Sequence, residues 1–332
     1  MLRLVTDLKA IRYNVLKIRK NEDKPIYLVV KANAYGHGAN MVAAHTEDIV
    51  KGFAVADVGE GVSLRESGIS KPILVLSFDE RHATAAVHYG LTAGVYTERQ
   101  MRSLARCGKD IAVHIAIDSG MHREGALPER ADCLLRLANE LGLKAQAAYT
   151  HYSSADNIAR QNGEFDKVNV PFKHSCATCA VVSGQCNYDA LRVGLAAYGY
   201  PKNCGYLPAL TVLSSVENIV SLLRGEGAGY DLAYTAERDT KLAIVFGGYA
   251  DGIRRSASGG SVVIKGKSYN IVGRVCMDSF AVDVGYDGIE VGDEVTILGA
   301  GITAESLAER QATIPYEVLC GFDTVRSKRY YV

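Results

Sequence analysis

The sequence predicts an α/β protein in which an N-terminal (β/α)8 TIM-like barrel is followed by a mostly β C-terminal domain. Up to about residue 206, short apolar runs alternate with helix-like stretches. From residue 207 onward, β-rich runs are separated by glycine- and aspartate-containing turns. A chain of 332 residues is long enough for two domains. We therefore assign residues 1–206 to the barrel and residues 207–332 to the β-rich domain.

Eight apolar runs of strand length support the barrel. They cover residues 26–31, 52–57, 72–78, 92–97, 111–118, 144–152, 170–176 and 191–199. Helical patterns fill most of the intervals, for example residues 128–142. A doubly wound sheet is the alternative, but no GxGxxG motif follows the first run. Eight βα units in roughly 200 residues favour the barrel.

The two ends of the chain complete the expected element order. The first twenty residues have the pattern of an amphipathic helix, with Leu8, Ile11, Val15 and Ile18 on one side. We expect the chain to begin close to this helix, without a strand before it. In the second domain, one helix over residues 303–312 interrupts the β-rich runs. Those runs cover residues 210–222, 241–249, 261–275, 280–285 and 293–299.

Composition indicates a protein that acts on a small molecule. Lysine plus arginine equals aspartate plus glutamate, 37 against 37, so no basic surface points to nucleic acid or to a membrane surface. No apolar run reaches the ~20 residues that span a bilayer, and the charged N-terminus lacks the core of a signal peptide. Eight cysteines without a secretory signal are typical of reduced thiols in a cytoplasmic protein.

The sequence does not predict a metal site. Cys176 and Cys179 have CxxC spacing, and Cys186 and Cys204 lie downstream. The downstream cysteines do not form the second closely spaced pair that a zinc or redox site needs. We expect small buried thiols.

Ionisable residues gather where a barrel enzyme has its active site. Lys31, Asp118, Arg123, His151 and Arg192 lie at or near the C-terminal ends of predicted barrel strands, and that rim carries the catalytic groups in this fold. From its position alone, Lys31 is either a lysine that reaches solvent or an amine that forms a Schiff base.

The segment VVKANAYGHG, residues 29–38, resembles the cofactor-lysine motif of the alanine racemases, which are fold type III enzymes that use pyridoxal 5'-phosphate. Further segments match in the family's order: IDSGMHREG, THYSSAD, LRVGLAAYG, GYDLAYTA, GGYADG, VGRVCMD and, more loosely, PYEVLCGF. The matches extend from residue 29 to about residue 322. The resemblance implies racemisation of L-alanine to D-alanine, which supplies peptidoglycan synthesis, by a cytoplasmic homodimer whose active sites are shared between subunits.

The resemblance also implies a role for each matching residue. Lys31 would hold the cofactor and act as one base, and Tyr230 would be the opposite base. Arg192 would face the pyridine nitrogen, with His151 holding the arginine. The implied cofactor-binding residues are Lys31, Tyr35, Arg123, His151, Thr178, Cys179, Arg192, Gly194, Leu195 and Tyr249. The implied substrate-binding residues are Arg123, Met277 and Asp278.

This assignment agrees with the chemistry of racemisation. A proton must leave one face of the α-carbon and another must arrive on the opposite face, so two bases must flank it. Lysine and tyrosine serve if the site shifts their pKa values toward the working pH. An arginine keeps its proton, and it therefore disfavours full protonation of the pyridine ring.

Three positions depart from the family pattern. Ala116 stands where many members have a lysine that orients the arginine, and an anion such as chloride beside Arg123 is one substitute. Thr178 and Cys179 stand where the family has asparagine and serine. After PYEVLCG, the chain has Phe322, Asp323 and Thr324 near the expected substrate pocket.

These departures leave alternatives open. A small polar side chain at residues 323–324 would leave room for a serine hydroxymethyl group, as in the serine or serine/alanine racemases of vancomycin resistance. A non-catalytic pyridoxal phosphate-binding protein and an amino-acid decarboxylase of the same fold type are further alternatives. The β-rich domain with Tyr230 favours a racemase over both.

Overall fold

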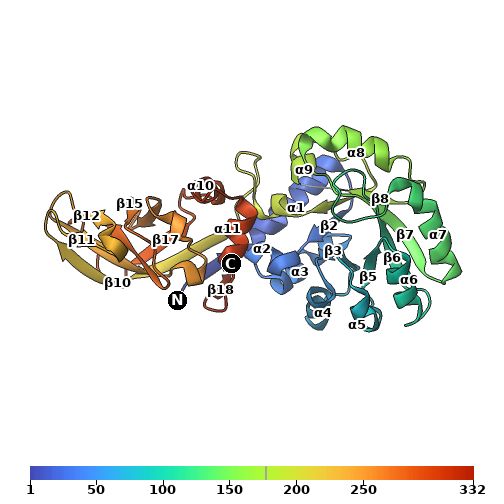
Figure 1. The fold of residues 1–332 in the computed structure, drawn as a ribbon, viewed down its shortest axis with the longest axis horizontal. Helices are drawn as coiled ribbons and strands as arrows, with labels where there is room; N and C mark the ends of the chain where they lie inside the picture. Colours follow the sequence, from blue (N-terminus) through green and yellow to red (C-terminus); the bar gives the residue numbers. More distant parts are fainter. Residues whose placement is uncertain (176–177) are drawn as a thin grey trace.

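In the computed structural model, which describes residues 1–175 and 178–332, eight parallel strands form a closed barrel at one end of an elongated molecule (Figure 1). In order around the barrel, these strands are β2 (Ile26–Val29), β3 (Gly52–Val55), β4 (Ile73–Val75), β5 (Thr92–Val95), β6 (Ala112–Ala116), β7 (Lys144–Tyr149), β8 (Lys173–Ser175) and β9 (Ala190–Val193). Seven of these strands lie within a predicted run, and β9 begins one residue before the eighth run. The predicted barrel is confirmed.

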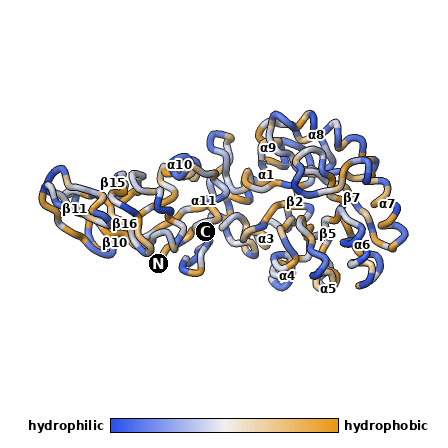
Figure 2. The backbone as a smooth tube through the Cα atoms, viewed as in Figure 1, coloured by the Kyte–Doolittle hydropathy of each residue, from blue (hydrophilic) through white to orange (hydrophobic). Residues whose placement is uncertain are grey.

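Helices surround the barrel strands and bury their outer faces. Every residue of β2, β3, β4, β5 and β9 is buried, which explains why these strands are continuous apolar runs in the sequence. Hydrophobic and hydrophilic segments alternate along the chain in both units (Figure 2). The helices of this unit are α1 (Leu8–Glu22), α2 (Lys31–Gly36), α3 (Ala39–Thr46), α4 (Val58–Glu66), α5 (Ala83–His88), α6 (Glu98–Ala105), α7 (Ala131–Glu140), α8 (Ile158–Phe165) and α9 (Thr178–Ser183).

The second unit is mostly β, as predicted. Its main sheet has the order β13-β16-β15-β14-β17-β10-β1-β18, and β10 also pairs with β13. The strands are β1 (Arg3–Thr6), β10 (Leu210–Leu222), β13 (Thr240–Phe246), β14 (Ser261–Ile264), β15 (Lys267–Val272), β16 (Ser279–Asp283), β17 (Glu294–Leu298) and β18 (Lys328–Tyr331). A short hairpin is formed by β11 (Gly227–Ala228) and β12 (Tyr234–Thr235), and the helices are α10 (Ala304–Arg310) and α11 (Pro315–Gly321).

The expectation that no strand precedes the first helix was wrong. Strand β1 pairs antiparallel with β10 and parallel with β18, so the chain starts in the second unit before it enters the barrel. Leu2, Leu4 and Thr6 are fully buried on one face of this strand. This alternation is only a few residues long, and Asp7 then caps α1 by accepting a hydrogen bond from the backbone N–H of Ala10.

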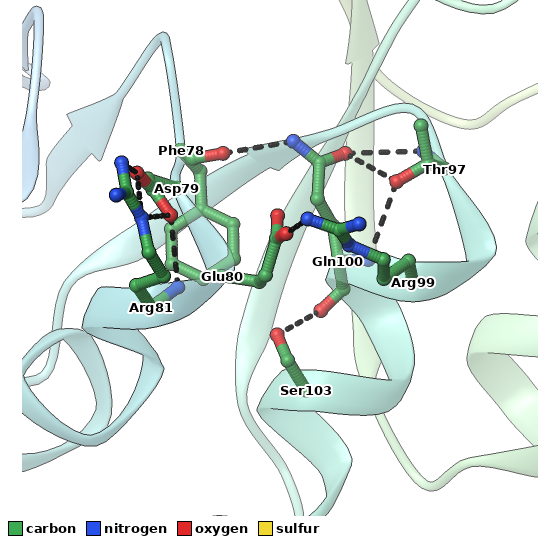
Figure 3. A network of polar contacts seen from close by, with 8 residues as sticks. All are labelled: Phe78, Asp79, Glu80, Arg81, Thr97, Arg99, Gln100 and Ser103. Atoms are coloured by element: carbon green, nitrogen blue, oxygen red, sulfur yellow. Dashed lines mark hydrogen bonds and ion pairs between the residues drawn. The ribbon is translucent and has the colours of Figure 1, made fainter.

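Side-chain hydrogen bonds hold the loop that follows the C-terminal end of β4 (Figure 3). The side-chain amide of Gln100 donates to the carbonyl of Phe78 at 2.8 Å. Its carbonyl oxygen accepts from the backbone N–H of Thr97, whose hydroxyl accepts from the N–H of Gln100 in return. This capping box therefore begins α6 and also holds the neighbouring loop.

The two units meet at α11, which lies between the barrel and the sheet, and at β18, which is an edge strand of that sheet (Figure 1). Helix α11 packs against α2, the turn that carries Lys31. Across the described ranges, no helix combines the length and apolar character needed to span a bilayer.

Candidate active site

A cavity of about 610 Å³ lies at the C-terminal ends of the barrel strands. It is of the size that holds a cofactor together with a small substrate. Nine residues singled out in the sequence for cofactor or substrate binding line it: Lys31, Tyr35, Arg123, His151, Thr178, Cys179, Arg192, Gly194 and Leu195. These residues lie far apart in the sequence, and the barrel topology brings them together.

Four predicted site residues do not line this cavity. Tyr230, Tyr249, Met277 and Asp278 all belong to the second unit. Tyr230 is 65% exposed, and Tyr249 and Met277 are about half exposed. Asp278 forms an ion pair with Arg326 at 2.5 Å. Within one chain, these side chains therefore lie on an exposed surface of the second unit, outside the cavity that Lys31 lines.

Lys31 enters the cavity from an unusual backbone turn. Strand β2 ends at Val29, and residues 32–35 then have φ between 50° and 54°, which is the left-handed region. Burial lowers the pKa of the Lys31 amine, and the positive charges of Arg123 and Arg192 lower it further, against the opposing effect of Glu60 and Glu124. A lysine with a lowered pKa is neutral, and hence nucleophilic and basic, in a larger share of molecules.

Tyr35 and Gly194 form a close contact at one end of the cavity. A Cβ atom at Gly194 would lie 2.5 Å from the Tyr35 hydroxyl oxygen, so this approach requires a glycine. Gly194 precedes the 3-10 turn Leu195–Tyr198. The ring of Tyr35 also lies 5.8 Å from that of Tyr316, centroid to centroid. A hydroxyl beside the start of a helical turn is suited to binding a phosphate group.

Arg192 is buried at the barrel end and held by several acceptors. Its Nη2 donates to the carbonyl of Thr150 at 2.6 Å, and its Nη1 donates to the carbonyl of His174 at 3.2 Å. Nη1 also lies 2.9 Å from Nδ1 of His174. The guanidinium stacks over the ring of Tyr149, with 4.7 Å between the arginine Cζ and the ring centroid.

These contacts determine the protonation of two buried histidines. An arginine only donates, so Nδ1 of His174 accepts from Arg192 and Nε2 of His174 carries the proton. Nε2 then donates to Nδ1 of His114 at 2.8 Å. Burial, and next the charge of Arg192, lower the pKa of His114 to about 3 and that of His174 well below its usual range. Sequence analysis missed His174, whose only signal was a histidine inside a barrel strand.

The neutral histidines make folding stability depend on pH. Their folded-state pKa values lie below the unfolded value of about 6.5, so unfolding takes up protons below that pH. The free energy of unfolding is therefore independent of these two histidines above about pH 6.5. Below that pH it falls toward pH 5, by up to about 1.4 kcal/mol per pH unit for each histidine. Urea denaturation at several pH values should show a smaller slope for His114→Gln than for wild type. An unchanged slope would contradict neutral burial of His114.

His151 lines the cavity, and its backbone carbonyl accepts from the side-chain amide of Gln161 at 3.0 Å. The hydrogen bonds described for Arg192 reach His174 and Thr150, so the predicted support of Arg192 by His151 stays a prediction. Thr178 and Cys179 begin α9, and burial raises the pKa of the Cys179 thiol. Cys176 lies outside the described residues.

The loop that carries Arg123 brings an overlooked carboxylate to the cavity. Asp118 ties the loop by accepting from the backbone N–H groups of Gly120 and His122, both at 2.9 Å. Glu124 lines the cavity beside Arg123, and its two carboxylate oxygens lie 3.1 and 3.2 Å from the Ser77 hydroxyl. Ala116 lines the same cavity. The predicted anion beside Arg123 stays a prediction.

Phe322, Asp323 and Thr324, the positions expected near the substrate pocket, do not line the cavity of the single chain. Phe322 is buried in the core, and Asp323 accepts a hydrogen bond from Asn33 and pairs with Arg329. From this part of the chain, Ile314 and Tyr316 line the cavity instead. Residues 315–321 form α11, and Phe322 is its C-cap residue. The serine alternative, which rested on a small polar residue at 323–324, therefore stays a prediction.

Comparison with known proteins covers both units. Residues 6–202 match the family model described as alanine racemase, N-terminal domain, and residues 209–331 match that of the C-terminal domain. The chain belongs to the alanine racemase family. It is accordingly an isomerase, and the family resemblance of the sequence motifs is confirmed.

Individual relatives match over their full length. The alanine racemases of Cutibacterium acnes and Lactococcus lactis subsp. cremoris are each 34% identical to this chain; the alignments cover 99% and 98% of it and 97% of each relative. The solved alanine racemase of a D-cycloserine-producing Streptomyces lavendulae is 30% identical, with a TM-score of 0.94 over 100% of this chain and 97% of that one. The alanine racemase of Clostridium difficile 630 is 32% identical, with a TM-score of 0.93 over 99% and 95%.

Proposed function

We propose that this protein is a cytoplasmic, pyridoxal 5'-phosphate-dependent racemase that interconverts L- and D-alanine by a two-base mechanism and supplies D-alanine for peptidoglycan. The observation that carries the proposal is a partly buried lysine with a lowered pKa, held in one cavity with a hydroxyl beside a glycine and with a buried arginine. These three features are suited to the aldehyde, the phosphate and the ring nitrogen of the cofactor.

The residues of the cavity offer partners for each part of pyridoxal 5'-phosphate. Tyr35 and the backbone amides of Gly194 and Leu195 would bind the phosphate, Lys31 would hold the aldehyde carbon, and Arg192 would face the ring nitrogen. Thr178, Cys179 and His151 would complete the part of the site that lies in this cavity, and Tyr249, which does not line it, would join from a partner subunit. When bound, the cofactor withdraws electrons from the substrate's α-carbon and so makes its proton more acidic.

Proton transfer would be the work of Lys31 and Tyr230 on opposite faces of the substrate. Lys31 has the lowered pKa that a base near neutral pH requires. Arg192 keeps its own proton because it stays charged and is held by His174 and Thr150, so it disfavours protonation of the ring nitrogen. Arg123 would bind the substrate carboxylate.

The second base would come from the partner subunit of a homodimer. Tyr230 is exposed in the single chain and belongs to the β-rich unit, so its hydroxyl is accessible to Lys31 of another copy. Met277 and Asp278 would reach the substrate from the same partner surface. A shared site of this kind makes dimer formation a condition of activity.

Alanine is expected to be preferred over serine. Tyr316 occupies the cavity wall, its ring packs near that of Tyr35, and its hydroxyl lies 3.5 Å from that of Thr178. This bulk limits the space for a hydroxymethyl group. We expect kcat/KM for L-alanine to exceed that for L-serine by about tenfold or more, and Tyr316→Ser to narrow the ratio.

A coupled assay with both amino acids tests the proposal. Purified protein freed of cofactor should racemise neither substrate, and pyridoxal 5'-phosphate should restore alanine racemisation. Tyr286→Ser is the comparison for Tyr316→Ser, since Tyr286 is an exposed tyrosine outside the cavity wall and its loss should leave the substrate ratio unchanged. Racemisation that proceeds equally well without cofactor would contradict the proposed function.

A further inference from the structure

The turn that carries Lys31 has a backbone that its own residues do not favour. Ala32, Asn33, Ala34 and Tyr35 all have φ between 50° and 54°, and none of them is glycine. Left-handed helical geometry is unfavourable for residues that carry a Cβ atom, because that atom comes too close to the following carbonyl oxygen. Contacts from outside the turn must therefore hold it.

One set of contacts comes from the barrel. Glu60, in α4, accepts from the backbone N–H of Ala32 at 2.6 Å and from that of Ala56, after β3, at 2.7 Å. A single carboxylate thus ties the first residue of the turn to the neighbouring barrel strand. These bonds hold the turn only at its beginning.

The second set comes from the C-terminal segment of the chain. The Asn33 amide donates to Oδ2 of Asp323 at 2.7 Å, and Asp323 forms an ion pair with Arg329. Arg329 also donates to the carbonyl of Gly36, the last residue of the turn. Gly36 itself lies against α11, since a Cβ atom there would be 2.6 Å from the carbonyl oxygen of Leu319.

The contacts of Asp323 and Arg329 hold the middle and the end of the turn. The side chains of Asp323 and Arg329 are 25% and 13% exposed, so the pair is shielded enough to be worth more than a surface ion pair. Arg329 lies in β18, which is anchored by pairing with β1. The turn is therefore fastened to a rigid sheet.

We infer that Asp323 and Arg329 are positioning residues of the active site, which hold the left-handed turn so that Lys31 and Tyr35 both face the cavity. Lys31 stands at one end of the turn and Tyr35 four residues later. Any release of the turn displaces both side chains together. The second unit thus shapes the site of its own chain, separately from any residue that a partner subunit adds.

The inference rests on the proposed roles of Lys31 and Tyr35 in cofactor binding. It is tested by a double-mutant cycle between Arg329→Met and Tyr35→Phe, with the Kd of pyridoxal 5'-phosphate for the cofactor-free protein measured by fluorescence titration. Arg329→Met should raise Kd about tenfold in the wild-type background and much less in the Tyr35→Phe background. Asp323→Asn keeps the side-chain volume and should give a smaller effect of the same kind.

Lys328→Met is the matched control, because Lys328 is exposed on the same strand and its amine lies over the ring of Tyr330. It should leave Kd unchanged. Thermal unfolding of the cofactor-free variants separates a loss of stability from a loss of positioning. If Arg329 only stabilises the fold, Arg329→Met lowers the Tm but its effect on Kd is not coupled to Tyr35. Where Tyr35→Phe itself weakens binding, an equal rise of Kd in both backgrounds, or no rise, would overturn the inference.

A second probe separates this inference from the proposed function. Pyridoxal, which lacks the phosphate, reports on Lys31 alone, and its binding should weaken in Arg329→Met relative to Lys328→Met. If Tyr35→Phe binds pyridoxal 5'-phosphate as tightly as wild type, the proposed phosphate role of Tyr35 fails and the pyridoxal result decides. Equal pyridoxal binding by Arg329→Met and Lys328→Met would then overturn the positioning role.

Discussion

Replacing Lys31 with alanine is expected to lower kcat for racemisation in both directions by at least about 10⁴-fold, because the substitution removes the covalent anchor of the cofactor and one of the two bases. The loss should be measured by polarimetry or a coupled assay with L- and D-alanine. The cofactor's absorbance band should disappear from the purified protein in parallel.

Lys167→Ala is a suitable control for this substitution. Lys167 is an exposed lysine paired with Glu164 on the outside of the barrel, so its loss should change neither activity nor absorbance. If Lys31→Ala keeps substantial activity with bound cofactor, another amine holds the cofactor and the assignment of Lys31 is wrong.

Replacing Tyr230 with phenylalanine is expected to lower kcat by about 10³-fold or more in both directions, because racemisation needs a proton donor on the face that Lys31 does not reach. Lys31 remains in place, so exchange of the α-proton with solvent should persist for one enantiomer only. Proton NMR in D₂O, started separately from L- and D-alanine, distinguishes the two faces.

Tyr286→Phe provides the matched comparison, since Tyr286 is an equally exposed tyrosine of the same unit, 68% against 65%. It should racemise like wild type. Normal racemisation by Tyr230→Phe would contradict the two-base assignment, and exchange of neither enantiomer would indicate that Lys31 had also been displaced.

The barrel was predictable because its strands are buried on both faces. Such strands are continuous apolar runs, and each of the eight runs indeed overlaps one strand. The rim residues followed from topology, since side chains at the C-terminal ends of barrel strands converge wherever they lie in the sequence. The five residues predicted in this way all line one cavity: Lys31, Asp118, Arg123, His151 and Arg192.

The parts that sequence analysis missed depend on distant contacts. The left-handed turn after β2 is held by Asp323 and Arg329, about 290 residues away from Asn33 and Gly36. Strand β1 exists because β10 and β18 flank it. Tyr316 lines the cavity because α11 packs against α2 at the end of the barrel. No local sequence pattern predicts this packing. Local propensity cannot supply such information.

The sequence motif predicts a role for Tyr230 as a base, but the single chain does not show a contact between Tyr230 and Lys31. In one chain it lies on the exposed surface of the β-rich unit, and we propose that a second copy brings it to Lys31. The central claim is therefore that each active site takes its lysine from one chain and its tyrosine from the other.

Mixing two inactive variants tests this claim most directly. Lys31→Ala and Tyr230→Phe chains, dissociated, mixed in equal amounts and reassociated, should form about half mixed dimers, each with one intact site. Racemisation should then recover to about one quarter of the wild-type rate per chain, while either variant alone stays inactive. Light scattering should confirm that the mixture is dimeric. A dimeric mixture that stays inactive would contradict a site shared between subunits.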